Sequence, residues 1–271
     1  MDGFIYGSKE FRDELETSAH HAGEIRFLES IARPGSHVID GGANRGVTTV
    51  ALAKSVAPDG HVYAFEPVPE YYETLRQNLS RNDTENASAF NLALSNQTGR
   101  IRFYKHGEGS GITPAEDAEM LWVQATTIPD FLEQRRIGRI NVLSLDCEGS
   151  ELFVLRGAKD ILEEQSPQIF CEMHHGYLKE LGQSANDIAD FLRDLGYEVQ
   201  PLHVEDLDEQ TTFEKCSHIY ARRQPEDNKV QRLKKEIADL RAQMPIHSIK
   251  PSMMQRLEEL EEELKAAQED R

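Results

Sequence analysis

The sequence predicts an α/β fold, in which helices cover both faces of a seven-stranded, mostly parallel, doubly wound sheet, followed by a helical tail. The first observation is that short apolar runs alternate with helical patterns over the first 225 residues. The second is that the sequence after residue 225 contains no aromatic residue and is rich in Glu, Lys, Gln, Leu and Ala. We therefore expect an N-terminal helical segment (1–34), an α/β domain (35–225) and a tail (226–271).

Each predicted element has a local reason. Apolar, β-rich runs bounded by turn residues predict strands at 37–39, 61–65, 88–92, 140–145, 168–171, 197–200 and 217–221. Helical patterns cover 8–31, 48–56, 69–81, 151–163 and 185–195. Pro69 suits the first turn of its helix, and Gly196 follows the last predicted helix as a C-cap. We also expect an extra strand at 100–104, followed by a Gly-rich loop at 107–111 of the kind that often shapes a substrate pocket.

The composition excludes several classes of protein. The chain has 30 Lys and Arg residues against 48 Asp and Glu residues, a net charge of -18, and such a chain repels nucleic-acid phosphates. We find no apolar run long enough to span a membrane and no signal-peptide pattern. The three cysteines, Cys147, Cys171 and Cys216, are expected to be reduced thiols, so we predict a cytoplasmic protein.

The first predicted strand runs into DGGANRG at residues 40–46, a D-x-G-x-N-x-G pattern between a strand and a helix. Gly42 and Gly46 let the backbone bend and approach a ligand, and the amides of the next helix can bind a carboxylate or phosphate. Glu66 ends the second strand, 20 residues after Gly46. A carboxylate in that place can accept both ribose hydroxyls of an adenosine.

Two ligands suit such a loop, a dinucleotide or S-adenosylmethionine. Asp40 opens the loop, and its charge would repel a pyrophosphate but suits a ligand with an ammonium and a sulfonium group. The glycines at 41, 42 and 46 also do not fit the dinucleotide pattern G-x-G-x-x-G. The loop therefore favours S-adenosylmethionine.

Further polar residues follow the fourth and fifth predicted strands. Asp146, Glu172 and His174 should converge at the edge where the strands end. Two chemistries stay open: Asp146 or His174 removes a proton from an acceptor hydroxyl, or all three bind a divalent cation such as Mg²⁺. We expect Glu148 and Glu151 only to cap the next helix, and His175 to be a solvated loop residue.

The chain resembles the FkbM-type methyltransferases. The resemblance rests on VIDGGANRGVTT, VYAFEP, NLALS, INVLSLDCEGSELFVLRGA and PQIFCEMH, which occur in family-like order between residues 38 and 174. It implies a Rossmann-like class I methyltransferase that uses S-adenosylmethionine to methylate hydroxyls of sugars or polyketides. It also implies a role for individual residues of the site. Asp40, Gly42, Asn44 and Gly46 would contact the methionine part of the cofactor, and Glu66 would bind the ribose. Residues 92–95, including Ala93 and Ser95, would lie near the adenine, and Asp146 would lie between cofactor and acceptor. Cys147 departs from the aliphatic residue that is usual in the family, which should be harmless.

The tail carries two apolar seams with heptad steps. They consist of Val230, Leu233, Ile237, Leu240 and Met244, and of Met253, Leu257, Leu260, Leu264 and Ala267. Pro245 and Pro251 separate them. Each helix alone is marginal in water, so each seam needs a partner: a second chain, the core or the other seam. We expect a coiled coil that makes the protein a homo-oligomer through residues 230–267.

The sequence therefore favours an O-methyltransferase that acts on a hydroxyl, with a saccharide or glycan as the preferred acceptor. Two alternatives stay open. One is methylation of a polyketide-type small molecule, and the other is a methyltransferase-fold scaffold organised by its coiled coil.

Overall fold

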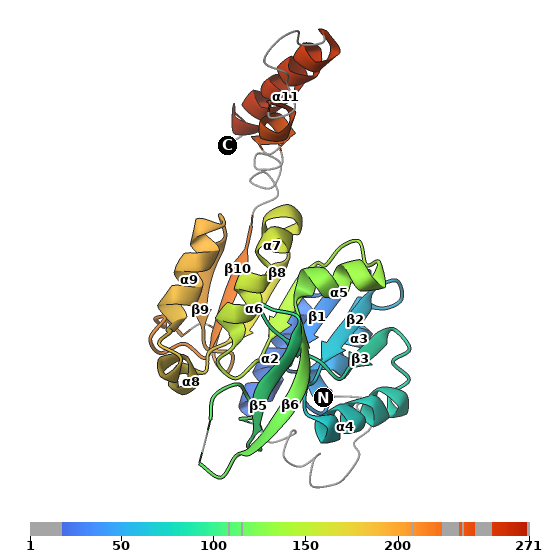
Figure 1. Cartoon of the computed structure of the whole chain (residues 1–271), viewed down its shortest axis with the longest axis vertical. Helices are drawn as coiled ribbons and strands as arrows, with labels where there is room; N and C mark the ends of the chain where they lie inside the picture. Colours follow the sequence, from blue (N-terminus) through green and yellow to red (C-terminus); the bar gives the residue numbers. More distant parts are fainter. Residues whose placement is uncertain are drawn as a thin grey trace. The chain divides into compact units, whose positions relative to one another are not determined.

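The computed structural model describes residues 18–107, 109–114, 116–207, 209–223, 233–234, 236–241 and 251–269 (Figure 1). The chain divides into two compact units, Met1–Arg222 and Arg223–Arg271. Within the described residues, no helix combines the length and apolar character that a membrane span requires.

A seven-stranded sheet forms the centre of the first unit. Its strands, in spatial order, are β3 (Ala87–Phe90), β2 (His61–Phe65), β1 (His37–Gly41), β7 (Val142–Leu145), β8 (Gln168–Glu172), β10 (His218–Arg222) and β9 (Glu198–Leu202). The first five pair in parallel, whereas β10 runs antiparallel to both of its neighbours. Pro201 is tolerated in β9 because that strand lies at the edge of the sheet. The predicted mostly parallel, seven-stranded sheet is confirmed.

Helices cover both faces of this sheet because successive strand residues point to opposite sides. Val38 of β1 lies in one apolar cluster and Ile39 in another. The first face packs against α2 (Ala19–Ile31), α3 (Val47–Val56) and α4 (Pro69–Arg81). The second face packs against α5 (Ile128–Arg135), α6 (Glu151–Gly157), α7 (Lys159–Gln165), α8 (His175–Glu180) and α9 (Ala185–Asp194).

A small second sheet lies beside the first, in the order β4 (Ala93–Leu94), β6 (Glu119–Thr126) and β5 (Gly99–Lys105). The extra strand predicted at 100–104 corresponds to β5. Phe103 and Val123 point inward and pack with Val68, while Trp122 is about half exposed on the other face. This sheet brings β5 and the loop after it to the functional edge.

Several predicted elements need correction. β6 is not among the predicted strands, because its outward-facing Met120 and Trp122 hide the alternation of polar and apolar residues. β4, α5 and α8 are also additional to the predicted elements. The single helix expected at 151–163 is two helices, α6 and α7, which meet at Ala158. The helix expected at 8–31 begins at Ala19 within the described residues, with Ser18 as its N-cap, and residues 8–17 lie outside them.

The described part of the second unit contains α11 (Pro251–Glu269), which begins at Pro251. Leu260 and Ala267 of this helix form an apolar cluster with Leu233 and Ile237. The two predicted seams therefore pack against each other within one chain, while Val230, Met244 and Pro245 lie outside the described residues. Pairing with a second chain through residues 230–267 stays a prediction.

Candidate functional site

The loop after β1 makes a tight turn that requires glycine at position 42. Gly42 has a φ of +82°, and a Cβ there would lie 1.7 Å from the carbonyl oxygen of Asp146. The N–H groups of Gly42 and Ala43 donate hydrogen bonds to the carbonyl oxygen of Phe65, at 3.0 and 2.9 Å. The loop thus joins the ends of β1, β2 and β7 at one edge of the sheet.

Asp40 lies at the base of this loop and is almost fully buried. Its Oδ2 accepts hydrogen bonds from Thr49 Oγ1 at 2.6 Å and from Thr48 Oγ1 at 3.4 Å. Burial raises the pKa of Asp40 to about 6, although the threonine hydroxyls act in the opposite direction. Gly46 caps the same helix, α3, in the left-handed region. Asp40 therefore helps to fix the first turn of α3.

Glu66 follows β2 and holds two backbone segments in place. Its Oε2 accepts a hydrogen bond from the N–H of Asn44 at 2.9 Å, and its Oε1 accepts one from the N–H of Val68 at 2.7 Å. Burial raises the pKa of Glu66 to about 7, while these two hydrogen bonds lower it. The side-chain Oδ1 of Asn44 is buried and accepts no hydrogen bond from any residue of the described ranges. Such an acceptor is free to receive a hydrogen bond from a bound ligand.

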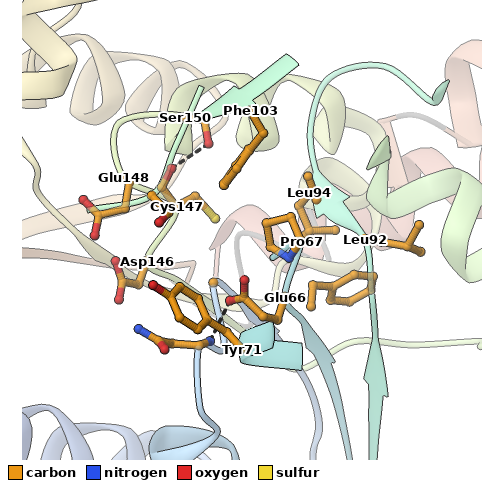
Figure 2. Close-up of a pocket in the computed structure, with 15 residues that line it drawn as sticks. Glu66, Pro67, Tyr71, Leu92, Leu94, Phe103, Asp146, Cys147, Glu148 and Ser150 are labelled. Atoms are coloured by element: carbon orange, nitrogen blue, oxygen red, sulfur yellow. Dashed lines mark hydrogen bonds between the residues drawn. The ribbon is translucent and has the colours of Figure 1, made fainter. Parts of the chain in front are cut away.

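A first pocket of about 510 Å³ opens beside Glu66 (Figure 2). Acidic and apolar side chains line different sides of this pocket. Asp146 and Glu148 lie on one side of Glu66 in this view, and Leu92 and Leu94 lie on the other. The other lining residues are Gly42, Asn44, Phe65, Pro67, Tyr71, Ala93, Phe103, Ser110, Cys147 and Ser150. Four of the predicted cofactor residues (Gly42, Asn44, Glu66 and Ala93) therefore line this pocket.

Three predicted cofactor residues lie elsewhere among the described residues. Gly46 supports α3, and Asp40 lines a second pocket instead of the first. Ser95 continues the small sheet, where its N–H donates to the carbonyl oxygen of Thr126 at 3.0 Å. The backbone of Ser95 therefore pairs with β6, and Ser95 is not among the residues that line the first pocket.

His174 lies among three carboxylates where β7 and β8 end. Its Nε2 is 3.4 Å from Asp146 Oδ1 and 3.2 Å from Glu148 Oε2, and its Nδ1 is 3.2 Å from Glu151 Oε1. Glu151 is fully buried and also accepts hydrogen bonds from two backbone N–H groups of the turn after β7. Ser150 is the N-cap of α6, so Glu151 does not cap this helix as expected. Glu151 instead holds the turn after β7 and orients His174.

The charges around His174 decide its protonation state. Burial lowers its pKa, but the hydrogen bond to Glu151 and the charges of Asp146, Glu151 and Glu148 outweigh burial and raise the pKa to about 10. Burial raises the pKa of Asp146 well above its ordinary value, and the charge of Glu172 acts in the same direction. A protonated imidazole cannot take a further proton, so of the two predicted bases only Asp146 remains a candidate.

The ligands of the predicted metal site are grouped differently from the expectation. Asp146 and His174 lie with Glu148, and one ligand atom from each lies within 4.8 Å of the others. Glu172 belongs to a second group, with its Oε1 3.3 Å from His20 Nε2 and 3.9 Å from His174 Nε2. Glu148, expected only to cap a helix, therefore takes the place beside His174 that was expected for Glu172.

A second pocket of about 630 Å³ lies on the other side of the β1 loop. It shares Gly42, Asn44 and Asp146 with the first pocket and is otherwise mostly polar. Asp40 and Glu172 are among its lining residues. Asp146 therefore lies where the two pockets adjoin.

The Gly-rich loop contributes to the first pocket, as its composition suggested. Ser110 lines that pocket. Tyr71 donates a hydrogen bond to the carbonyl oxygen of Gly107 at 3.0 Å, and Tyr177 donates one to that of Gly109 at 3.2 Å. Sequence reasoning missed both tyrosines, because nothing in their local pattern points to a loop that is distant in sequence.

Residues 40–199 match the family model described as "Methyltransferase FkbM domain". This chain belongs to the FkbM methyltransferase family. Its predicted resemblance to that family is confirmed.

Individual relatives of this FkbM-family chain are distant. "Methyltransferase 1" of Beauveria bassiana is 26% identical over 148 residues, which cover 46% of this chain and 59% of that protein. "Hexuronic acid methyltransferase AglP" of Haloferax volcanii is 27% identical over 153 residues, covering 56% and 62%. The crystal structure of an FkbM methyltransferase from Methylobacillus flagellatus matches with a TM-score of 0.49 and 17% identity, covering 73% of this chain and 50% of that one. The chain spans less than two thirds of the length of these curated relatives.

The family match has clear limits along this FkbM chain. It includes the β1 loop, Glu66, Asp146 and His174. It leaves out His20 and Glu24 in α2 and His218 in β10, which lie beside the second pocket.

Proposed function

We propose that this FkbM-family protein is an S-adenosylmethionine-dependent O-methyltransferase that acts on a hydroxyl group, preferably of a saccharide or glycan. The observation that carries the proposal is the position of Asp146, which lines both pockets beside the β1 loop. A residue in that position can contact a methyl donor and a methyl acceptor at the same time.

The residues of the first pocket fit S-adenosylmethionine. Glu66 would accept the ribose hydroxyls, and Leu92 and Leu94 offer an apolar surface for the adenine. The unpaired Oδ1 of Asn44 and the carboxylate of Asp146 suit the ammonium and sulfonium charges. When bound, S-adenosylmethionine supplies an electrophilic methyl group on its sulfonium.

Asp146 and His174 would manage the proton of the acceptor. Asp146 would take the proton of the acceptor hydroxyl as that oxygen accepts the methyl group supplied by the bound donor. His174 holds that carboxylate through Nε2, at 3.4 Å, and is itself held by buried Glu151. The main contribution of the site is positioning, because in-line transfer needs the reacting atoms about 3–3.5 Å apart.

The lining of the second pocket supports a polar acceptor. Carboxylates and hydroxyls, among them Glu24, Thr48 and Ser144, offer hydrogen bonds to an acceptor with many hydroxyls. A relative named as a hexuronic acid methyltransferase supports the same choice. A polyketide-type acceptor stays the alternative.

Calorimetric titration of S-adenosylhomocysteine into the protein is the first test. We expect micromolar binding, about -8 kcal/mol, that is lost in Asn44→Ala and kept in a control that lines neither pocket, Asn186→Ala. Methyl transfer to saccharide and polyketide acceptors would then be compared by mass spectrometry. Tight binding without transfer to any hydroxyl would favour the scaffold alternative, and absence of binding would contradict the proposal.

A further inference from the structure

Two histidines and two glutamates form a compact group beside the second pocket. We call it the His20 cluster: His20 and Glu24 of α2, Glu172 at the end of β8 and His218 at the start of β10. Its ligand atoms all lie within 4.8 Å of one another. His218 Nε2 is 3.0 Å from Glu24 Oε1, and His20 Nε2 is 3.3 Å from Glu172 Oε1.

Both histidines turn the same nitrogen inward and have a partner on the other. Nε2 of each faces the glutamates. Nδ1 of His218 is 3.1 Å from Ser217 Oγ, and Nδ1 of His20 is 3.7 Å from Glu205 Oε1. Histidines that bind metals almost always have such an outer partner, which fixes the ring and its tautomer. His218 matches this pattern through its hydrogen bond with Ser217, while Nδ1 of His20 has only the longer ion-pair contact with Glu205.

The rigid surroundings favour a preformed site. His218 is fully buried, and its ring stacks on Phe170 with centroids 4.4 Å apart. Glu24 is 7% exposed, whereas Glu172 and His20 keep about a fifth to a third of their side-chain surface exposed. The cluster is thus held by the core on one side, and Glu24, Glu172 and His218 also line the second pocket.

The spacing of the four atoms fits one small ion. A tetrahedral ion with bonds of about 2.0–2.1 Å holds its ligand atoms about 3.3 Å apart. The contacts of 3.0 and 3.3 Å are close to that value, and His20 Nε2 lies 3.9 Å from Glu24 Oε1. Only small side-chain movements would bring all four atoms to bonding distance.

We propose that the His20 cluster binds one divalent transition-metal ion of the Zn²⁺ type at the wall of the second pocket. Two imidazoles with two carboxylates suit Zn²⁺ or Co²⁺, whereas Mg²⁺ and Ca²⁺ prefer oxygen ligands alone. The ion would join α2 to β8 and β10, so part of the site comes from outside the matched family segment. The proposal concerns metal binding and does not depend on methyl transfer.

The test uses the full chain without an affinity tag, stripped of metal and titrated with Co²⁺ and Zn²⁺. We expect one equivalent of Co²⁺ to give the visible absorption of a tetrahedral site, and one equivalent of Zn²⁺ to displace it. Glu172→Gln and His20→Gln should each weaken binding at least 100-fold, since each removes a ligand. His61→Gln is the matched control and should leave binding unchanged, because this histidine of β2 forms a hydrogen bond with Ser88 of β3, away from the cluster.

Glu148→Gln separates the His20 cluster from the group around His174. Unchanged Co²⁺ absorption in this variant supports the proposal, whereas its loss, with binding kept in Glu172→Gln, would assign the ion to Asp146, Glu148 and His174. Circular dichroism checks that each variant is folded, and His20 offers a variant outside the buried core because its side chain is partly exposed. Absence of stoichiometric binding by the folded wild-type chain would leave an ion-pair network and overturn the proposal.

Discussion

Replacing Glu66 by glutamine should change how the stability of the protein depends on pH. Burial raises the pKa of Glu66 from 4.5 to about 7. Between pH 4.5 and pH 7, the folded state therefore keeps the Glu66 proton, whereas the unfolded chain has released it. Stability therefore falls as the pH rises through this window. Going from 4.5 to about 7 corresponds to about 3 kcal/mol at full ionisation. A glutamine has no such ionisation penalty.

The variant also carries a cost that does not depend on pH. Both oxygens of Glu66 accept backbone hydrogen bonds, and the amide NH₂ of glutamine would face one of these donors. An unsatisfied buried group of this kind costs about 1–3 kcal/mol. We therefore expect Glu66→Gln to be less stable than the wild type near pH 4.5 and to gain on it by about 3 kcal/mol up to pH 8.

Urea unfolding at several pH values measures this difference directly. The control is Glu85→Gln, which changes an exposed glutamate and should keep a constant offset from the wild type. A Glu66→Gln offset that stays constant from pH 4.5 to 8, or moves in the opposite direction, would refute the reasoning about burial. The measurement needs no ligand, so it tests the pocket separately from the proposed activity.

Three other substitutions test the site and the tail. Gly42→Ala should abolish S-adenosylhomocysteine binding in calorimetry, because the Cβ would lie 1.7 Å from a carbonyl oxygen, while Gly176→Ala, with open space around it, should bind normally. Asp146→Asn should keep binding within a few-fold but lose about 10²–10⁴-fold in turnover; equal turnover would rule out Asp146 as the base. Leu260→Ala should lower the stability of the second unit by about 2–5 kcal/mol, because this side chain is only 2% exposed. Thermal unfolding monitored by circular dichroism measures the change, and an unchanged melting profile would contradict the packing of the two seams.

The main sheet could be predicted because its strands and helices carry regular patterns. Val38 and Ile39 show this, because these neighbouring residues of β1 point to opposite faces of the sheet and both are apolar. The second sheet was harder, because β6 exposes Trp122 and Met120 on its outer face and so lacks the usual alternation. The packing partner of the tail helices could not be predicted either, because an apolar seam indicates that a helix needs a partner but does not identify that partner.

The candidate site was predictable where it follows strands. Asp40, Glu66 and Asp146 lie at the ends of parallel strands, which meet at one edge of the sheet. Glu148 and Glu151 could not be separated from ordinary helix caps, because their contact with His174 depends on how the turn folds. His218 had no such signal, since it begins a strand instead of ending one.

The reversed direction of β10 has a practical consequence. His218 reaches the same edge as the ends of the parallel strands because β10 is antiparallel and pairs His218 with Glu172. The last residue of that strand, Arg222, is therefore at the opposite edge of the sheet. A fluorophore or fusion partner attached directly after β10 would begin on that opposite edge, away from the strand ends that carry the pocket residues.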